Sequence, residues 1–243
     1  MLLLGGALVA GFVSGFAGFG TGLVASGFWF VALPPTSVPP LIVFTSVIAQ
    51  LMALFRLRQS FDWRGVSPYL IGGVLGLPFG IVALQVASAS VLRVTVGFFL
   101  VAYALVQLSA IRDWSIRSWG GWRADMAIGG GGGFLGGFAG LSGPLPLIWL
   151  QLRGGPSVRQ RMTYQPFNLI ILALAGLGML LAGQIDGSVV RAVTWCLPVT
   201  VLGTWIGLRL YSAAGEALFK RVVLILLLIS GSILVTQSIT ALQ

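Results

Sequence analysis

The stretch SGFAGFG at residues 14–20 and its near copy GGFAGLS at residues 136–142 decide how this chain folds. Both contain the tetrapeptide Gly-Phe-Ala-Gly, which begins at Gly15 and again 122 residues later at Gly137. Glycine weakens a helix interior because it gains no side-chain contacts and loses much backbone freedom on folding. The sequence therefore predicts an interrupted helix at each of the two places.

The composition indicates a membrane protein. The 243 residues are 57% hydrophobic and only 8% charged, which leaves too little polar surface to cover a water-soluble protein of this size. Apolar runs of about 20 residues, the length that crosses a bilayer, recur along the whole chain. We expect an all-α, polytopic integral membrane protein with one membrane domain. The apolar runs lie near residues 2–33, 38–55, 66–86, 91–111, 126–152, 163–183, 189–211 and 217–238.

Several functional classes are disfavoured by the residues present. The net charge of +9 comes from basic residues scattered in short connections, so it indicates topology and lipid headgroups rather than nucleic acid. The chain has no histidine and one cysteine, so we expect no metal site, no cofactor and no enzymatic activity. No Asp or Glu lies in the middle of a predicted span, since residues such as Asp125 fall at or near loops. A carboxylate proton relay is therefore not expected.

A second match suggests that the whole chain is duplicated. Val74-Leu75-Gly76, with Gly80 four residues further on, returns as Val201-Leu202-Gly203 with Gly207, an offset of 127. We predict a first repeat over about 1–111, a loop at 112–124, and a second repeat over about 125–243. Each repeat has one broken segment and three plain spans.

The positions of the basic residues bear on topology, because cytoplasmic loops are enriched in Lys and Arg. If all eight segments crossed the membrane, each side would carry seven basic residues. If the first and fifth segments are re-entrant hairpins, the count becomes twelve against two, with only Arg93 and Arg191 on the poorer side. Three crossings per repeat would insert the halves in opposite directions, as inverted repeats do. Eight ordinary spans remain the alternative. The twelve residues are Arg56, Arg58, Arg64, Arg112, Arg117, Arg123, Arg153, Arg159, Arg161, Arg209, Lys220 and Arg221.

The two breaks are the candidate binding site. A broken helix offers free backbone N–H groups and a partial positive charge, both of which attract anions. Ser46 and Asn168 stand 122 residues apart, at matching positions of the two halves. The candidate substrate-binding residues are Ser14, Gly15, Phe16, Ala17, Gly18, Thr21, Ser46, Gln50, Gly137, Phe138, Ala139, Gly140, Ser142, Tyr164, Gln165 and Asn168.

Close helix packing is the alternative explanation for the glycines, and we favour it for Gly76, Gly80, Gly203 and Gly207. For Thr45, a bond to its own helix is the alternative to ligand binding.

The sequence resembles the sulfite exporter TauE/SafE family over nearly its whole length. The likeness lies in GFVSGFAGFGTG at 11–22, FDWRGVSPYLIGGVLGLPFG at 61–80 and the second Gly-rich stretch at 129–143. The resemblance implies a transporter in a bacterial or archaeal plasma membrane that moves small anions such as sulfite and sulfoacetate. In this chain Phe16 and Phe19 interrupt the first glycine cluster, which suits an organic tail better than bare sulfite.

We therefore expect a carrier that binds a small sulfur-containing or carboxylate anion between the breaks and works by alternating access. An anion channel and a non-transporting scaffold subunit are the alternatives. The expected partners are the anion and membrane lipids, and a homodimer stays open.

Overall fold

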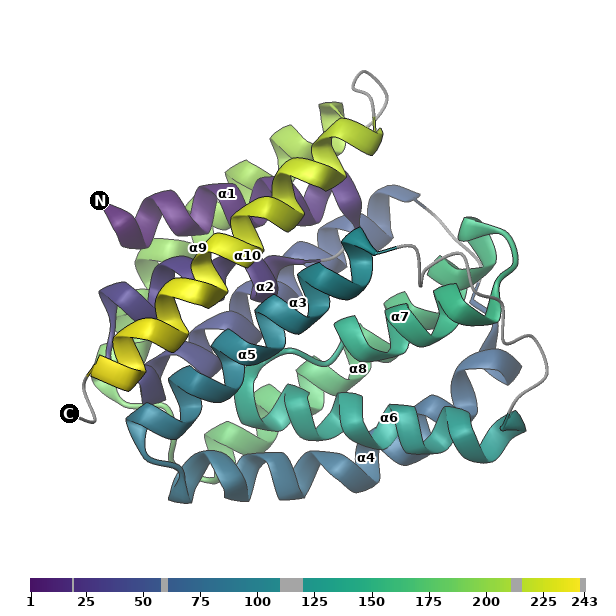
Figure 1. Ribbon diagram of the computed structural model, residues 1–243, viewed down its shortest axis with the longest axis horizontal. Helices are drawn as coiled ribbons and strands as arrows, with labels where there is room; N and C mark the ends of the chain where they lie inside the picture. The colour runs from purple at the N-terminus through teal and green to yellow at the C-terminus, as the bar shows by residue number, and fades with distance from the viewer. Residues whose placement is uncertain (19, 58–60, 110–119, 211–215, 241–243) are drawn as a thin grey trace.

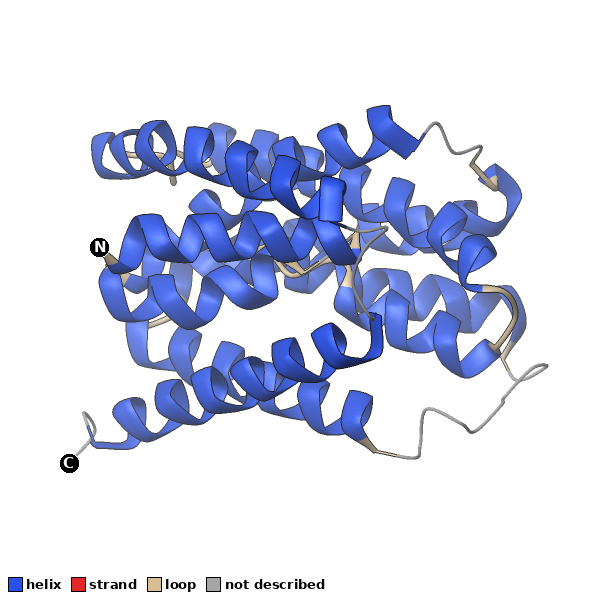
Figure 2. Ribbon diagram, turned by 90° about the horizontal axis from the view of Figure 1, so that it is seen from above, coloured by secondary structure: helices blue, strands red, loops and turns tan. Residues whose placement is uncertain are grey.

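The computed structural model describes residues 1–18, 20–57, 61–109, 120–210 and 216–240, which form helices and short connections without a strand (Figures 1 and 2). The predicted all-α fold class is confirmed. The helices are α1 (Leu2–Ala17), α2 (Thr21–Ala32), η1 (Pro35–Ser37), α3 (Val38–Leu57), α4 (Trp63–Val86), α5 (Ala89–Leu108), α6 (Gly121–Ala139), α7 (Pro144–Arg153), α8 (Ser157–Leu181), α9 (Gly187–Leu210) and α10 (Glu216–Thr240).

Length and surface both identify a multi-pass membrane protein. Five stretches of the described chain are long and apolar enough to cross a bilayer, and they lie within η1–α3, α4, α5, α8 and α9. Large apolar side chains also point outward, among them Phe79, Phe98 and Leu181, at 70%, 69% and 81% exposure. Such a surface is unfavourable in water and suits a hydrocarbon environment.

The chain reverses at both predicted interruptions. α1 packs against α2, and α6 packs against α7, so neither glycine-rich segment runs straight through the bundle (Figure 1). α1 and α2 contain 16 and 12 residues, and α7 contains only 10, so these pieces are shorter than a typical span. How the two hairpins insert relative to the membrane stays a prediction.

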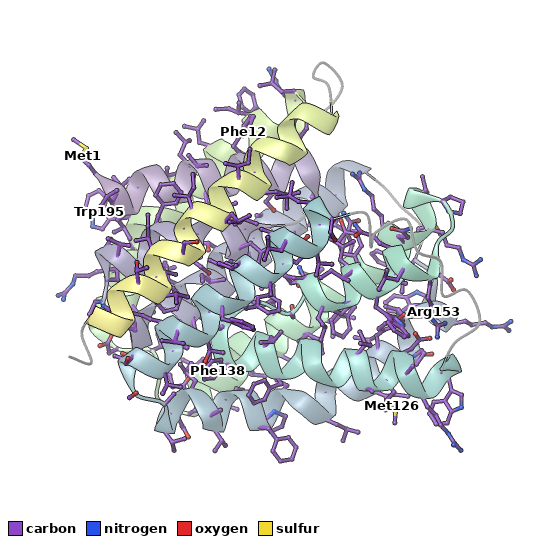
Figure 3. The ribbon with its side chains drawn as sticks, in the orientation of Figure 1. Met1, Phe12, Met126, Phe138, Arg153 and Trp195 are labelled. Carbon is purple, nitrogen blue, oxygen red and sulfur yellow. The ribbon has the colours of Figure 1, made fainter. Side chains whose placement is uncertain are left out.

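The bundle has two ends, which we name by their residues. The terminal end carries Met1 and Trp195, and the arginine end carries Met126 and Arg153 (Figure 3). α1 starts and α10 stops at the terminal end (Figure 1). Arg93 and Arg191, the two residues of the poorer side in the hairpin topology, lie near the starts of α5 and α9 at that same end. Outside the described residues lie Arg58 and residues 112–119 of the predicted loop, which include Arg112 and Arg117.

Glycines allow very close contacts between helices of the described chain. A β-carbon on Gly76 would meet the carbonyl oxygen of Gly130, and one on Gly203 would meet that of Leu8. The backbones of α4 and α6, and those of α9 and α1, therefore touch with no side-chain layer between them. The packing role favoured for Gly76 and Gly203 is confirmed, and Gly80 and Gly207 make the corresponding contacts with Phe134 and Phe12.

These contacts correspond to each other under the sequence offsets. Gly130 is 122 residues after Leu8, and Gly203 is 127 residues after Gly76, so each contact is the counterpart of the other. In each case a helix of one half lies along a helix of the other. α1 and α6 run in opposite directions, as Met1 and Phe12 show against Met126 and Phe138 in Figure 3. Opposed directions are what an inverted repeat requires, and the repeat boundaries themselves stay predictions.

Candidate anion-binding site

Glycines in the left-handed region turn the chain at both breaks. Gly18 has a φ of 77° and ends α1, with its N–H donating to the carbonyl of Ser14 at 2.8 Å. Gly140 has a φ of 72° and ends α6 in the same way, donating to the carbonyl of Gly136 at 3.0 Å. Other residues adopt this conformation only with strain, so glycine is required at these two positions.

The two breaks line one small pocket. Residues 20–23 approach it from the start of α2, and residues 140–144 from the end of α6 and the start of α7. Ser46 and Gln50 line it from α3, and Asn168 and Leu172 line it from α8. Asn168 and Leu172 are the 122-residue counterparts of Ser46 and Gln50, so the wall is built from matching positions of the two halves. We call this the central pocket.

The central pocket contains very little free space. Its volume is about 20 Å³, which is room for about one water molecule. A sulfite or sulfonate group has at least four heavy atoms and needs more space than this. The central pocket in this structure is therefore too small for an anion of this class.

Two hydroxyls in the central pocket have no hydrogen-bond partner among the described residues. Thr21 Oγ1 and Ser46 Oγ are both buried, at 2% and 3% residue exposure. Buried polar groups almost always find a partner, so an orphaned pair in one pocket indicates a bound ligand or water. Ser142 differs because its hydroxyl donates to Oδ1 of Asn168.

The two helix N-termini at the pocket are unequal. In α2 the first helical bond is from the N–H of Val24 to the carbonyl of Gly20, so the N–H groups of residues 21–23 have no acceptor within the helix. In α7, Pro144 and Pro146 have no N–H at all, and Leu145 supplies the one donor between them. The start of α2 therefore offers more free amide donors to the pocket than the start of α7 does.

The other predicted residues lie around the central pocket without lining it. Gly15 and Gly137 face the backbones of α9 and α4, where a β-carbon would meet the carbonyls of Thr204 and Leu77. Phe16 and Phe138 are buried next to Phe12 and Phe134. Ser14 and Ala139 are buried in α1 and α6, and the side chain of Ala17 lies outside the described residues.

Polar side chains adjoin only one of the two left-handed glycines. The hydroxyl of Tyr164 lies 3.5 Å from the carbonyl oxygen of Gly18, and Gln165 lies beside the same glycine. At Gly140 the neighbours are Ile42 and the backbone of Pro39. Ile42 is the counterpart of Tyr164, so the position beside the left-handed glycine is polar at one break and apolar at the other.

Larger cavities lie at both ends of the bundle. The cavity at the arginine end, which we call the vestibule, has a volume of about 310 Å³. A cavity of about 300 Å³ at the terminal end is lined by Gln85, Gln184 and Asp186, among others. The vestibule is lined by Asp62, Gly65, Tyr69, Asp125, Leu150, Arg153, Gly154, Gly155, Arg159, Gln160 and Thr163.

Asp125 is the polar residue that sequence reasoning missed. The predicted segment began at residue 126, whereas α6 begins at Gly121 and buries Asp125 to 8% exposure. The Tyr69 hydroxyl and the Trp149 indole N–H both donate to its Oδ1 at 2.7 Å, and Arg153 lies 3.2 Å from its Oδ2. Trp149 and Arg153 are four residues apart, on one face of a helix, and this spacing was the available signal.

Metal chemistry has no support in the described part of the chain, where no three His, Cys, Asp or Glu residues gather closely enough to hold an ion.

Comparison with known proteins gives one family. Residues 3–234 match the family model described as Sulfite exporter TauE/SafE. The chain is 26% identical over 230 residues to the probable sulfite/organosulfonate exporter TauE of Cupriavidus necator, which covers 92% of this chain and 89% of that protein. No solved structure matches the chain.

Proposed function

Because the chain belongs to the sulfite exporter TauE/SafE family, a family of membrane transporters, we propose that it is a secondary carrier for small oxyanions, with sulfite and organosulfonates as the first candidates. The observation that carries this proposal is the central pocket, where two orphaned hydroxyls and the free amides of α2 converge. The pocket lining contains no ionised side chain. A negatively charged guest supplies the acceptors that these donors lack.

The donor set favours an anion that is held by many moderate hydrogen bonds. Because no lysine or arginine lines the central pocket, binding depends on helix-end amides and hydroxyls, each of which contributes about 1.5–3 kcal/mol toward a charged group. A transported anion must also leave the site, so moderate affinity is useful. Leu23, Leu141 and Leu172 complete the lining and offer apolar contact to the organic part of a sulfonate.

A small central pocket and a larger cavity at each end of the bundle are the parts that alternating access needs. The anion would enter from one cavity, occupy the central pocket while it is sealed on both sides, and leave through the other. A channel needs a continuous path for ions, and the central pocket of about 20 Å³ is too narrow to be part of one in this structure. We propose a prokaryotic plasma membrane as its location, and the bacterial origin of the relative supports this proposal.

Counterflow in liposomes tests the carrier. Purified protein in vesicles preloaded with unlabelled sulfoacetate is expected to accumulate labelled sulfoacetate transiently, because a carrier exchanges trapped substrate for external substrate. A channel would only dissipate the gradient, and a scaffold would give no flux. Thermal stabilisation by sulfite, thiosulfate, sulfoacetate, taurine and short carboxylates would rank the anions.

Failure of all these anions both to stabilise the protein and to exchange would reject the proposed function. Protein-free vesicles are the control for leakage.

A further inference from the structure

Three side chains around Asp125 form a donor set that fits an oxyanion. The hydroxyl of Tyr69 comes from α4, whereas the indole N–H of Trp149 and the guanidinium of Arg153 come from α7. The indole and the guanidinium can only donate hydrogen bonds. The bonds from the hydroxyl and the indole reach one oxygen of a carboxylate while the guanidinium lies next to the other oxygen, which is how proteins recognise carboxylates and sulfonates.

Arg153 is positioned by contacts other than its ion pair. One of its terminal nitrogens donates to the carbonyl oxygen of Gly121 at 2.8 Å. Its guanidinium carbon also lies 5.4 Å from the centroid of the Trp149 ring, within the range of a cation–π contact. The guanidinium would therefore stay in place if the carboxylate of Asp125 were exchanged for another anion.

Tyr69, Asp125 and Arg153 line the vestibule, which gives room for a ligand beside them. At about 310 Å³ it can hold a small organic anion, which the central pocket of about 20 Å³ cannot in this form. Four charged side chains face the vestibule, and they balance. Arg153 pairs with Asp125, and Arg159 Nε lies 4.0 Å from Asp62 Oδ2. An anion that enters must therefore compete with a carboxylate of the protein.

The donor set belongs to one end of the molecule only. The counterparts of Asp125, Trp149 and Arg153 in the first half, 122 residues earlier, are Leu3, Gly27 and Val31. The counterpart of Tyr69, 127 residues later, is Cys196. The cluster is therefore not part of the duplicated pattern.

We propose that Tyr69, Trp149 and Arg153 form a second oxyanion site, in the vestibule, and that Asp125 occupies it as a resident carboxylate. A sulfonate or carboxylate arriving at the arginine end displaces Asp125 from Arg153 and waits there before it passes to the central pocket. The role of this site in transport rests on the proposed function. Its ability to bind an oxyanion depends only on the three donors. No covalent step is involved.

The change Asp125→Asn tests this site. The amide oxygen of asparagine can still accept from Tyr69 and Trp149, but the charge that competes for Arg153 is gone. Binding of methanesulfonate, measured by isothermal titration, is expected to tighten by about tenfold, which corresponds to the loss of about 1.4 kcal/mol of competition. The titration is made with Thr21→Val and Ser46→Ala present, so that the central pocket contributes little.

Two further variants sharpen the result. Adding Arg153→Gln to Asp125→Asn is expected to abolish the gain, because the anion then has no guanidinium to bind. Asp186→Asn is the matched control, since it removes one negative charge in the same way at the terminal end. There Asp186 caps α9 by accepting from Ser188 and from the N–H of Val189, and asparagine also caps helices. If Asp125→Asn does not fold, Asp125→Ser takes its place.

Unchanged methanesulfonate affinity in folded Asp125→Asn, or a gain that survives Arg153→Gln, would overturn the vestibule site. The two proposals fail separately. Normal counterflow together with an unchanged Asp125→Asn variant rejects only the vestibule site. Absence of counterflow together with tightened, Arg153-dependent binding rejects the carrier and leaves the vestibule site standing.

Discussion

Replacing Thr21 by valine and Ser46 by alanine together is expected to lower transport by about a hundredfold while the folded protein becomes more stable. Each hydroxyl would donate one hydrogen bond to the bound anion, and a bond to a charged group contributes about 1.5–3 kcal/mol, or about tenfold in affinity at the lower limit. Neither hydroxyl has a hydrogen-bond partner among the described residues, so its removal relieves a desolvation cost of about 1–3 kcal/mol. Counterflow and thermal unfolding measure the two effects.

Opposite signs for transport and stability distinguish a binding site from a packing site. A hydroxyl needed for packing would lower both quantities when removed. Thr45→Val is the matched control, because Thr45 neighbours Ser46 and its hydroxyl already donates to the carbonyls of Leu41 and Ile42 in its own helix. Its removal should leave transport unchanged. Full transport activity in the double variant would exclude Thr21 and Ser46 from the site.

The change Gly76→Ala is expected to cost about 3 kcal/mol of stability or to prevent recovery of folded protein. The added methyl group would fall on the carbonyl oxygen of Gly130, which is backbone and cannot rotate away. α4 and α6 would have to separate along their whole contact. The fraction of monodisperse protein in detergent and its unfolding temperature check this result.

Gly5→Ala is the control for helix propensity. Gly5 lies inside α1, and a β-carbon there meets nothing within 4 Å. Alanine is the better helix former, so the variant should fold as well as the parent or better. Equal loss of protein in both variants would show that general helix effects, rather than the contact with Gly130, decide the outcome.

The sequence predicted the membrane class, the two interruptions and the family, because each depends on composition or on short-range pattern. A run such as residues 63–86 is apolar wherever it folds, and Gly18 and Gly140 disrupt a helix whatever surrounds them. The offset of 122 residues also indicated that Ser46 and Asn168 face one site, and both line the central pocket. Whether these residues bind the anion stays a prediction.

The remaining features depend on contacts between distant segments, which no local pattern contains. Gly15 and Gly137 look like Gly18 and Gly140 in sequence, yet a helix from the other half lies against each of them. In the sequence Asp125 resembles a loop residue, because its hydrogen-bond partner Tyr69 lies 56 positions away in the chain. The unequal N-termini of α2 and α7 could have been read from Pro144 and Pro146, since proline lacks an N–H wherever it occurs.

The backbone contacts between α4 and α6, and between α1 and α9, bear on how the protein would change shape. The two helices of each pair touch through their backbones, with no side chains between them that could rearrange. Each pair should therefore move as one rigid body. Each body then joins a hairpin from one half of the sequence to a plain helix from the other. Spin labels on α4 and α6 should keep a fixed spacing through the transport cycle, whereas labels on α4 and α1 should report the rearrangement.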